Sequence, residues 1–220
     1  MTIQIRSGGS ASIQVRYRLS IYAVLRDVRR TQTGRIVLNL LDQAGYDVII
    51  EPNLDPAGSN NASEIGASGV HEGNARLGVS ARGTRSFVAY SPNRLTGRGV
   101  GMGRDEVLLH ELCHSLRTVN GRMRKRSNGQ LLAMAGGFHN VEEFFAAMVT
   151  NVHSSELGRP ARGDHGTGRL RSIDQLRKPP FDRRLRQFSI SMPVLCRQLA
   201  ALPPTVAPFN PFRDIATVRA

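Results

Sequence analysis

The sequence predicts a single α+β domain in which a small twisted sheet packs against amphipathic helices. The chain has 220 residues, of which 40% are hydrophobic and 21% are charged, and this balance suits a globular protein with a buried core. Short apolar runs with the length of strands alternate with longer stretches of helical periodicity. No low-complexity linker divides the chain, so we treat residues 1–220 as one domain.

The N-terminal part, residues 1–52, is expected to form helices and one strand. Apolar and polar residues alternate over 12–18, which fits a strand or the approach to a helix. Helical spacing follows over 20–30, and we expect Thr-Gly at 33–34 to interrupt it before a second amphipathic helix. The apolar run at 47–51 predicts a short buried strand, which the next residue, a proline, stops.

The middle of the chain changes from irregular to regular structure. Residues 53–85 are rich in Gly, Ser and Asn and predict a loop with one weak strand near 75–79. The run Ser-Phe-Val-Ala-Tyr-Ser at 86–91 predicts a strand. A helix is expected over 105–117, with Asp105 as its N-cap.

A strongly apolar helix is expected over 140–153, and it completes a core segment that we place at 86–155. Beyond residue 158 the chain is rich in Arg, Gly and Pro, with a short helical patch near 188–202. Residues 203–220 are expected to form a loosely held tail.

The chain is strongly basic, with 30 basic and 17 acidic residues and a net charge of +13. Only two of the basic residues are lysines, so the other 28 are arginines, which bind phosphate well. A nucleic-acid-binding protein is therefore one alternative function. Aromatic residues make up only 5% of the chain, there is no tryptophan, and the basic loop at 122–126 contains no aromatic residue. Because stacking surfaces are missing, we do not expect a nucleic acid partner.

Hydropathy predicts no membrane anchor and no cleaved leader. No window of about 18 apolar residues occurs, so no membrane span is expected. The first ten residues lack an apolar stretch, so we expect no signal peptide. The protein is then expected in the cytoplasm before any export. The two cysteines, Cys113 and Cys196, are expected to be buried thiols.

Residues 110–114 read His-Glu-Leu-Cys-His inside a helix with an apolar flank. Side chains at i and i+4 lie on one helix face, so His110 and His114 could bind one Zn²⁺ ion per chain. Glu111 lies beside that face, where its carboxylate could reach a water on the ion. With six His and eight Glu in the chain, a random order would give roughly 0.006 such matches. The plainer alternative is two surface histidines around a glutamate.

A third zinc ligand must come from elsewhere in the chain. A third histidine six residues after His114 is excluded, because that position is Asn120. Glu142 and Glu143 begin an otherwise apolar helix, and charged residues are seldom buried unless they are paired or metal-bound. We predict Glu143 as the third ligand and leave Glu142 to solvent or to support of the site. The alternative is that both acids only stabilise the helix N-terminus.

The pairing of His-Glu-Leu-Cys-His at 110–114 with Glu-Glu-Phe-Phe-Ala at 142–146 resembles the gluzincin metallopeptidases. In particular it is similar to bacterial effector and toxin proteases: type III-injected effector zinc endopeptidases, clostridial neurotoxin light chains and the protease domain of anthrax lethal factor. The resemblance covers about 105–155 and implies a zincin-like metallopeptidase fold.

The resemblance also implies roles and partners. It carries the zinc ligands onto His110, His114 and Glu143, and the general base onto Glu111. It implies a protein substrate, such as a host or competitor protein, and a secreted effector or toxin that acts in a target cell. A cognate inhibitor or a secretion carrier would be a further partner.

Families of this kind also use a tyrosine, histidine or arginine to stabilise the oxyanion. Tyr90, His139, His153 and His165 are the candidates that we consider for this role. The predicted strand at 86–91 is expected to lie at the lip of the cleft and to pair with an extended substrate.

The expected reaction is hydrolysis of a peptide bond. Zinc would activate a water and polarise the scissile carbonyl, while Glu111 would take the proton and pass it to the leaving amine. Besides nucleic-acid binding, two alternatives keep the metal: a structural zinc site, which has no use for a base at Glu111, and hydrolysis of a non-peptide amide.

Overall fold

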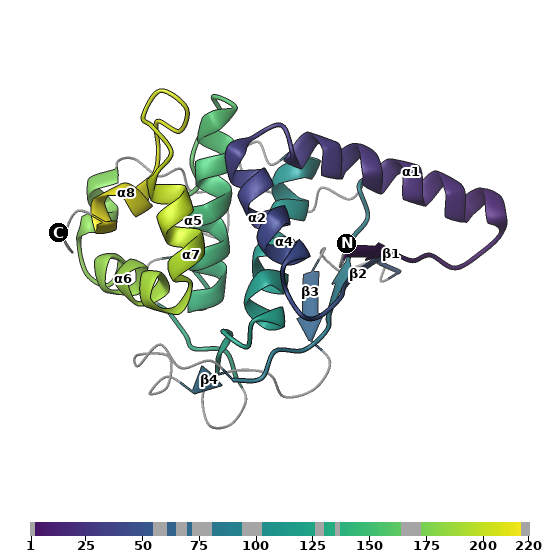
Figure 1. Cartoon of the computed structure of the whole chain (residues 1–220), viewed down its shortest axis with the longest axis horizontal. Coiled ribbons are helices and arrows are strands. Elements are labelled where there is room, and N and C mark those ends of the chain that lie inside the picture. The colour runs from purple at the N-terminus through teal and green to yellow at the C-terminus, as the bar shows by residue number, and fades with distance from the viewer. Residues whose placement is uncertain are drawn as a thin grey trace.

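The computed structural model describes residues 3–54, 61–64, 70–71, 81–93, 103–125, 130–134, 137–163 and 173–216. Within these residues, helices surround a small and mostly parallel sheet (Figure 1), which is compatible with the predicted α+β class. Buried apolar residues from β1 at one end of the chain to α8 at the other form a continuous core. In the part of the chain that is described, no helix is long and apolar enough to cross a membrane.

The main sheet has the strand order β1-β2-β5-β3. Strands β1 (Ile3–Ile5), β2 (Val48–Glu51) and β5 (Ser86–Ala89) run parallel, and β3 (Asn61–Glu64) pairs antiparallel with β5. The strands predicted from 47–51 and 86–91 are therefore confirmed.

The sheet corrects two expectations about the middle of the chain. β3 lies in the stretch that we expected to be mostly loop, whereas the weak strand near 75–79 falls outside the described residues. β5 is hydrogen-bonded to β2 on one side and to β3 on the other, so it has no free edge for a substrate. The prediction that 86–91 pairs with a substrate is wrong, and β3 takes the edge position in the described sheet. A second, two-stranded sheet joins β4 (Val70–His71) to β6 (Arg124–Lys125).

Helices α1 (Ala11–Val28) and α2 (Gln32–Asp42) both pack on α4, and α2 also packs on α5 and α7 (Pro193–Ala200). The stretch 12–18, in which apolar and polar residues alternate, is helical. It belongs to a helix whose buried face is formed by later residues, Ile21, Val24, Leu25 and Val28. Thr33 and Gly34 do not interrupt a helix but lie inside α2. The chain breaks two residues earlier, where the side chain of Thr31 accepts the Gly34 N–H at 2.9 Å and caps the helix.

Gly34 is required for close packing rather than for a turn. A Cβ at this position would lie 1.9 Å from the carbonyl oxygen of Val28, which no other residue type could tolerate. The helix start is also held by the side chain of Glu156, which accepts the backbone N–H groups of Gln32 and Thr33 at 2.6 and 2.8 Å.

Helix α4 (Arg104–Val119) occupies the centre of the molecule, between β3 and α5 (Val141–Glu156), and α2 packs against both α4 and α5 (Figure 1). Its N-cap is Gly103 and not Asp105, whose side chain is buried in the first turn and bonded to residues of the α5 region. At the start of α5, the side chain of Asn140 accepts the N–H groups of Glu142 and Glu143 at 2.9 and 3.0 Å.

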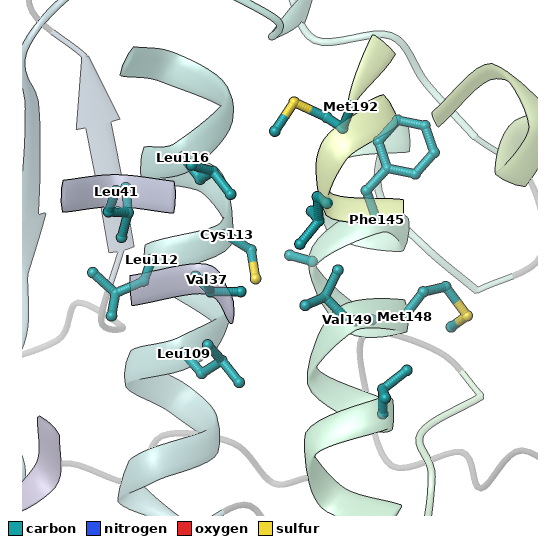
Figure 2. Close-up of a cluster of buried hydrophobic side chains, with 14 of the residues drawn as sticks. Val37, Leu41, Leu109, Leu112, Cys113, Leu116, Phe145, Met148, Val149 and Met192 are labelled. Atoms are coloured by element: carbon teal, nitrogen blue, oxygen red, sulfur yellow. The ribbon is translucent and has the colours of Figure 1, made fainter. Parts of the chain in front are cut away.

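Apolar side chains of α2, α4 and α5 form a buried cluster around these helices (Figure 2). Leu109, Leu112 and Leu116 come from α4, and Phe145, Met148 and Val149 come from α5. Cys113 lies in the same cluster and is 5% exposed, as expected for a buried thiol. Because these side chains are buried against one another, they hold α4 and α5 together.

The C-terminal part is more ordered than its composition suggested. It contains a 3₁₀ turn (Ile173–Arg177) and the helices α6 (Phe181–Ser191), α7 (Pro193–Ala200) and α8 (Pro211–Ala216). The expectation of a loose tail over 203–220 is wrong for its described part, because Ala207, Asn210 and Phe212 are buried. The Asn210 amide donates to the carbonyl of Leu199 at 2.7 Å and ties this segment to α7.

Candidate metal centre

Helix α4 presents the two motif histidines to α5. His110 and His114 are one helical turn apart, and both are buried, at 4% and 7% exposure. Their rings meet edge to face, with centroids 4.9 Å apart and an interplanar angle of 80°. The two Nε2 atoms lie 3.2 Å from each other. The i, i+4 spacing therefore does aim both imidazoles at one point.

The first turn of α5 brings Glu143 to the same point. One carboxylate oxygen lies 3.0 Å from Nε2 of His110, and the other lies 3.4 Å from Nε2 of His114. The side chain of Glu143 is 18% exposed, which makes it the most accessible of the three groups. These are the three residues predicted as metal ligands, and we call them the metal triangle. In the described part of the chain they form the group whose donor atoms could share one ion, since these atoms lie within 4.8 Å of one another.

The size of the metal triangle fits zinc. Bonds of about 2.0–2.1 Å from a tetrahedral ion place neighbouring donor atoms about 3.3–3.4 Å apart. The observed edges of 3.0, 3.2 and 3.4 Å are close to this value. Two imidazole nitrogens and one carboxylate oxygen are also ligand types that zinc accepts, and three protein ligands leave a fourth position for water or substrate.

The electrostatics of the metal triangle favour a cation. Burial lowers the pKa of His110 to about 4, so its ring is neutral at pH 7 and able to coordinate. Burial would also lower the pKa of His114, but the hydrogen bond and charge of Glu143 outweigh it and raise this pKa to about 9. His114 and Glu143 therefore share a proton near neutral pH, and a metal that binds between them must displace it.

Glu111 lies beside the metal triangle but outside it. Its side chain is on the next position of α4 and the residue is 7% exposed. Its charge contributes to the raised pKa of His114, so the carboxylate is within electrostatic reach of a ligand ring. Glu111 is therefore near the metal triangle but is not one of its three members.

We expected Glu142 either to face solvent or to support the site, and it does not face solvent. It is fully buried and forms an ion pair with Arg117, whose Nη2 donates to Oε1 at 3.0 Å. The same oxygen accepts the backbone N–H of Arg124 at 2.9 Å. The guanidinium of Arg117 lies 4.9 Å from the ring centroid of Phe145, over its face. This pair joins α4 to α5 directly behind Glu143.

A second buried polar group joins the other ends of α4 and α5. His153 is fully buried between two residues: its Nε2 donates to Asp105 at 3.0 Å, and its Nδ1 is hydrogen-bonded to the hydroxyl of Thr31 at 2.6 Å. Burial raises the pKa of the Asp105 carboxyl, but the bond from His153 and the charge of Arg159 outweigh it and lower this pKa to about 2. The antiparallel helices are thus held together by buried polar contacts at both ends, with the metal triangle between them.

The structure places two of the four oxyanion candidates away from the metal triangle. Tyr90 donates its hydroxyl to the carbonyl of Arg104 at 2.8 Å, and Arg104 is about 9 Å along α4 from His110. His153 follows Glu143 by ten residues, which is about 15 Å along α5. Tyr90 and His153 are therefore bonded at the start of α4 and not at the metal triangle. His139 is exposed just before α5, and His165 falls outside the described residues.

Arg162 is a charged residue near the site that sequence reasoning did not select. It is 9% exposed, and its backbone N–H donates to the side chain of Asn151 at 2.8 Å, while the Asn151 amide donates back to its carbonyl at 2.8 Å. Its positive charge is the smallest of the causes that act on the pKa of His110, and it lowers this pKa, so the guanidinium is within electrostatic range of the metal triangle. No pattern in the sequence distinguishes this arginine from the other 27.

A scan against protein-family models and a search of curated proteins found no match to the chain. Function must therefore be inferred from the site itself.

Proposed function

We propose that the chain is a zinc-dependent metalloendopeptidase with a zincin-like fold, which hydrolyses peptide bonds of a protein substrate. The observation that carries the proposal is the metal triangle of His110, His114 and Glu143, with the Glu111 carboxylate beside it but outside it. A purely structural zinc site is closed by four protein ligands and has no use for an adjacent base.

The residues around the metal triangle have complementary tasks. A zinc ion supplies Lewis acidity, which lowers the pKa of water toward 7 and polarises a carbonyl oxygen. Glu111 accepts the proton of the attacking water and later delivers it to the leaving amine. Glu142 and Arg117 hold the first turn of α5, so that Glu143 keeps its orientation.

The sheet offers a place for the substrate backbone. β3 is at the edge of the described main sheet, and α4 packs against it. An extended peptide that pairs with β3 would run beside the helix that carries His110 and His114. The backbone bonds would fix the scissile carbonyl with little dependence on substrate sequence.

The biological setting follows from the resemblance of the two motifs. We propose that the chain is a bacterial effector or toxin, made in the cytoplasm and then secreted or injected. Its substrate would be a host or competitor protein, and a cognate inhibitor or secretion carrier would restrain it until delivery.

The proposal is tested with the purified full-length chain. It should contain about one zinc per chain and generate new N-termini in a proteome lysate. His110→Ala should remove both the zinc and the new N-termini, because two ligands do not hold the ion. His139→Ala, outside the metal triangle, should keep the zinc. A wild-type chain that binds zinc but creates no new N-termini would contradict the proposal, and so would a His110→Ala chain with full zinc content.

Arg162 is proposed to stabilise the oxyanion that forms on the scissile carbonyl. Arg162→Met is expected to lower kcat by about 10²–10³-fold, while KM and zinc content stay near their wild-type values. Arg162→Lys should recover part of the loss, and Arg186→Met, an exposed arginine on α6, should change nothing. Steady-state kinetics and metal analysis measure these values. A fall in zinc content equal to the fall in activity would show that Arg162 acts only on the fold of the site.

A further inference from the structure

Large apolar side chains on the described surface gather on α1. Among the residues that the structure describes, six large apolar side chains are exposed, and four of them belong to this helix. Figure 1 shows the first half of α1 projecting beyond the sheet, away from α5 and the C-terminal helices. This part of the helix is distant from the cluster of helices that carries the metal triangle.

Three of these side chains form a continuous line. Val15, Leu19 and Tyr22 are 54%, 63% and 55% exposed and occupy positions i, i+4 and i+7. They fall within about 60° around the helix axis. We call these three residues the α1 stripe. The core face of α1 is made by other residues, from Ile21 to Val28, so the fold does not need the α1 stripe.

The charges around the α1 stripe are of one sign. Arg18 and Arg26 are exposed on the same side of the helix, and Arg26 continues the line of Leu19 and Tyr22 by one further turn. The only acid on α1, Asp27, lies off this side and pairs with Arg104 at 3.1 Å. A surface that complements the stripe must therefore be apolar at its centre and acidic at its rim.

We propose that the α1 stripe is a docking site for a partner protein, which receives it in an apolar groove rimmed by Asp and Glu. Anchors at i, i+4 and i+7 are the pattern by which an amphipathic helix binds a groove. Tyrosine and arginine, which flank the aliphatic pair here, are the residues enriched at the energetic centres of protein interfaces.

Two other occupants fit the surface less well. A second copy of the chain would bring Arg18 and Arg26 against the same arginines, which costs energy. A membrane would require a broader apolar face, and the opposite side of α1 is already used by the core. The inference does not depend on the proposed peptidase activity, because it uses no residue of the metal triangle.

The first experiment places a photo-crosslinking amino acid at Leu19 in the full chain, in lysate of the source organism. The matched control places it at Ile13, which is also exposed on α1 but lies on the side opposite the stripe. An adduct specific to Leu19 is expected, and its partner peptide should be rich in Asp and Glu. No adduct, or the same adduct from both positions, would overturn the proposal.

The second experiment measures binding between the purified chain and the purified adduct partner. Leu19→Ser with Tyr22→Ser, and separately Arg18→Glu with Arg26→Glu, should each weaken Kd by at least about tenfold. Ile13→Ser should change it less than twofold. Circular dichroism checks that all variants remain folded. Dimers in sedimentation, or stripe-dependent binding to vesicles of phosphatidylcholine and phosphatidylserine, would reassign the stripe to a second copy or to a membrane and overturn the proposal.

Discussion

Glu111→Gln is expected to lower kcat by about 10²–10⁴-fold, the contribution of general acid–base catalysis, while zinc content stays near one per chain. The amide keeps the size of the carboxylate but cannot accept a proton at neutral pH. The metal triangle does not include Glu111, so its ligands remain in place. Cleavage of a peptide substrate and metal analysis on the same preparation provide the two measurements.

Two outcomes would contradict this assignment. Activity within about threefold of wild type would show that another group takes the proton. Loss of zinc together with activity would show that Glu111 is a ligand or holds one in place. Glu111→Asp is a useful additional variant, because it keeps the negative charge but its shorter side chain places the carboxylate closer to the backbone.

Glu142→Ala is expected to destabilise the chain by about 3–5 kcal/mol, because it leaves the guanidinium of Arg117 buried without its carboxylate. Both side chains are nearly inaccessible, at 2% and 0% exposure, so water cannot replace the lost partner. The backbone N–H of Arg124 loses its acceptor at the same time. Equilibrium unfolding in urea measures the change.

A double variant separates the cost of a lone charge from the value of the pair. Arg117→Met with Glu142→Leu removes both charges and should recover most of the lost stability. A surface pair serves as the control: Asp174 and Arg177 are 68% and 59% exposed, and Asp174→Ala should cost less than about 1 kcal/mol. A Glu142→Ala effect as small as this control would show that Arg117 finds another partner.

Local sequence patterns predicted the parts of the fold that depend on one segment alone. The strands at 48–51 and 86–89 and the helices around 110 and 145 follow from apolar runs and helical spacing. The prediction of a helix break at Gly34 was wrong. Glycine usually ends helices, whereas this glycine lies inside α2 and allows the helix to approach Val28 closely. The burial of Phe212 depends on α6 and on other distant residues, so the spacing of the last residues could not indicate it.

The metal triangle was predictable for the same reason. The one-turn spacing of His110 and His114 fixes their relation within a single helix, and Glu143 stood out as an acid next to a strongly apolar run. Arg117 and Arg162 were missed as site residues, because their positions depend on contacts between segments and the chain has 28 arginines to choose from. Tyr90 and His153, two of the oxyanion candidates, are instead bonded to partners near the start of α4.

The three donor atoms come from two helices that are joined only when the chain is folded. His114 and Glu143 are separated by 28 intervening residues. An unfolded chain therefore keeps at most His110 and His114 near each other, and two such ligands hold an ion weakly. If the chain is the zinc enzyme that we propose, any process that pulls α4 away from α5, such as threading through a narrow channel, would release the zinc and stop the reaction. Recovery would then require both refolding and a fresh ion from the new surroundings.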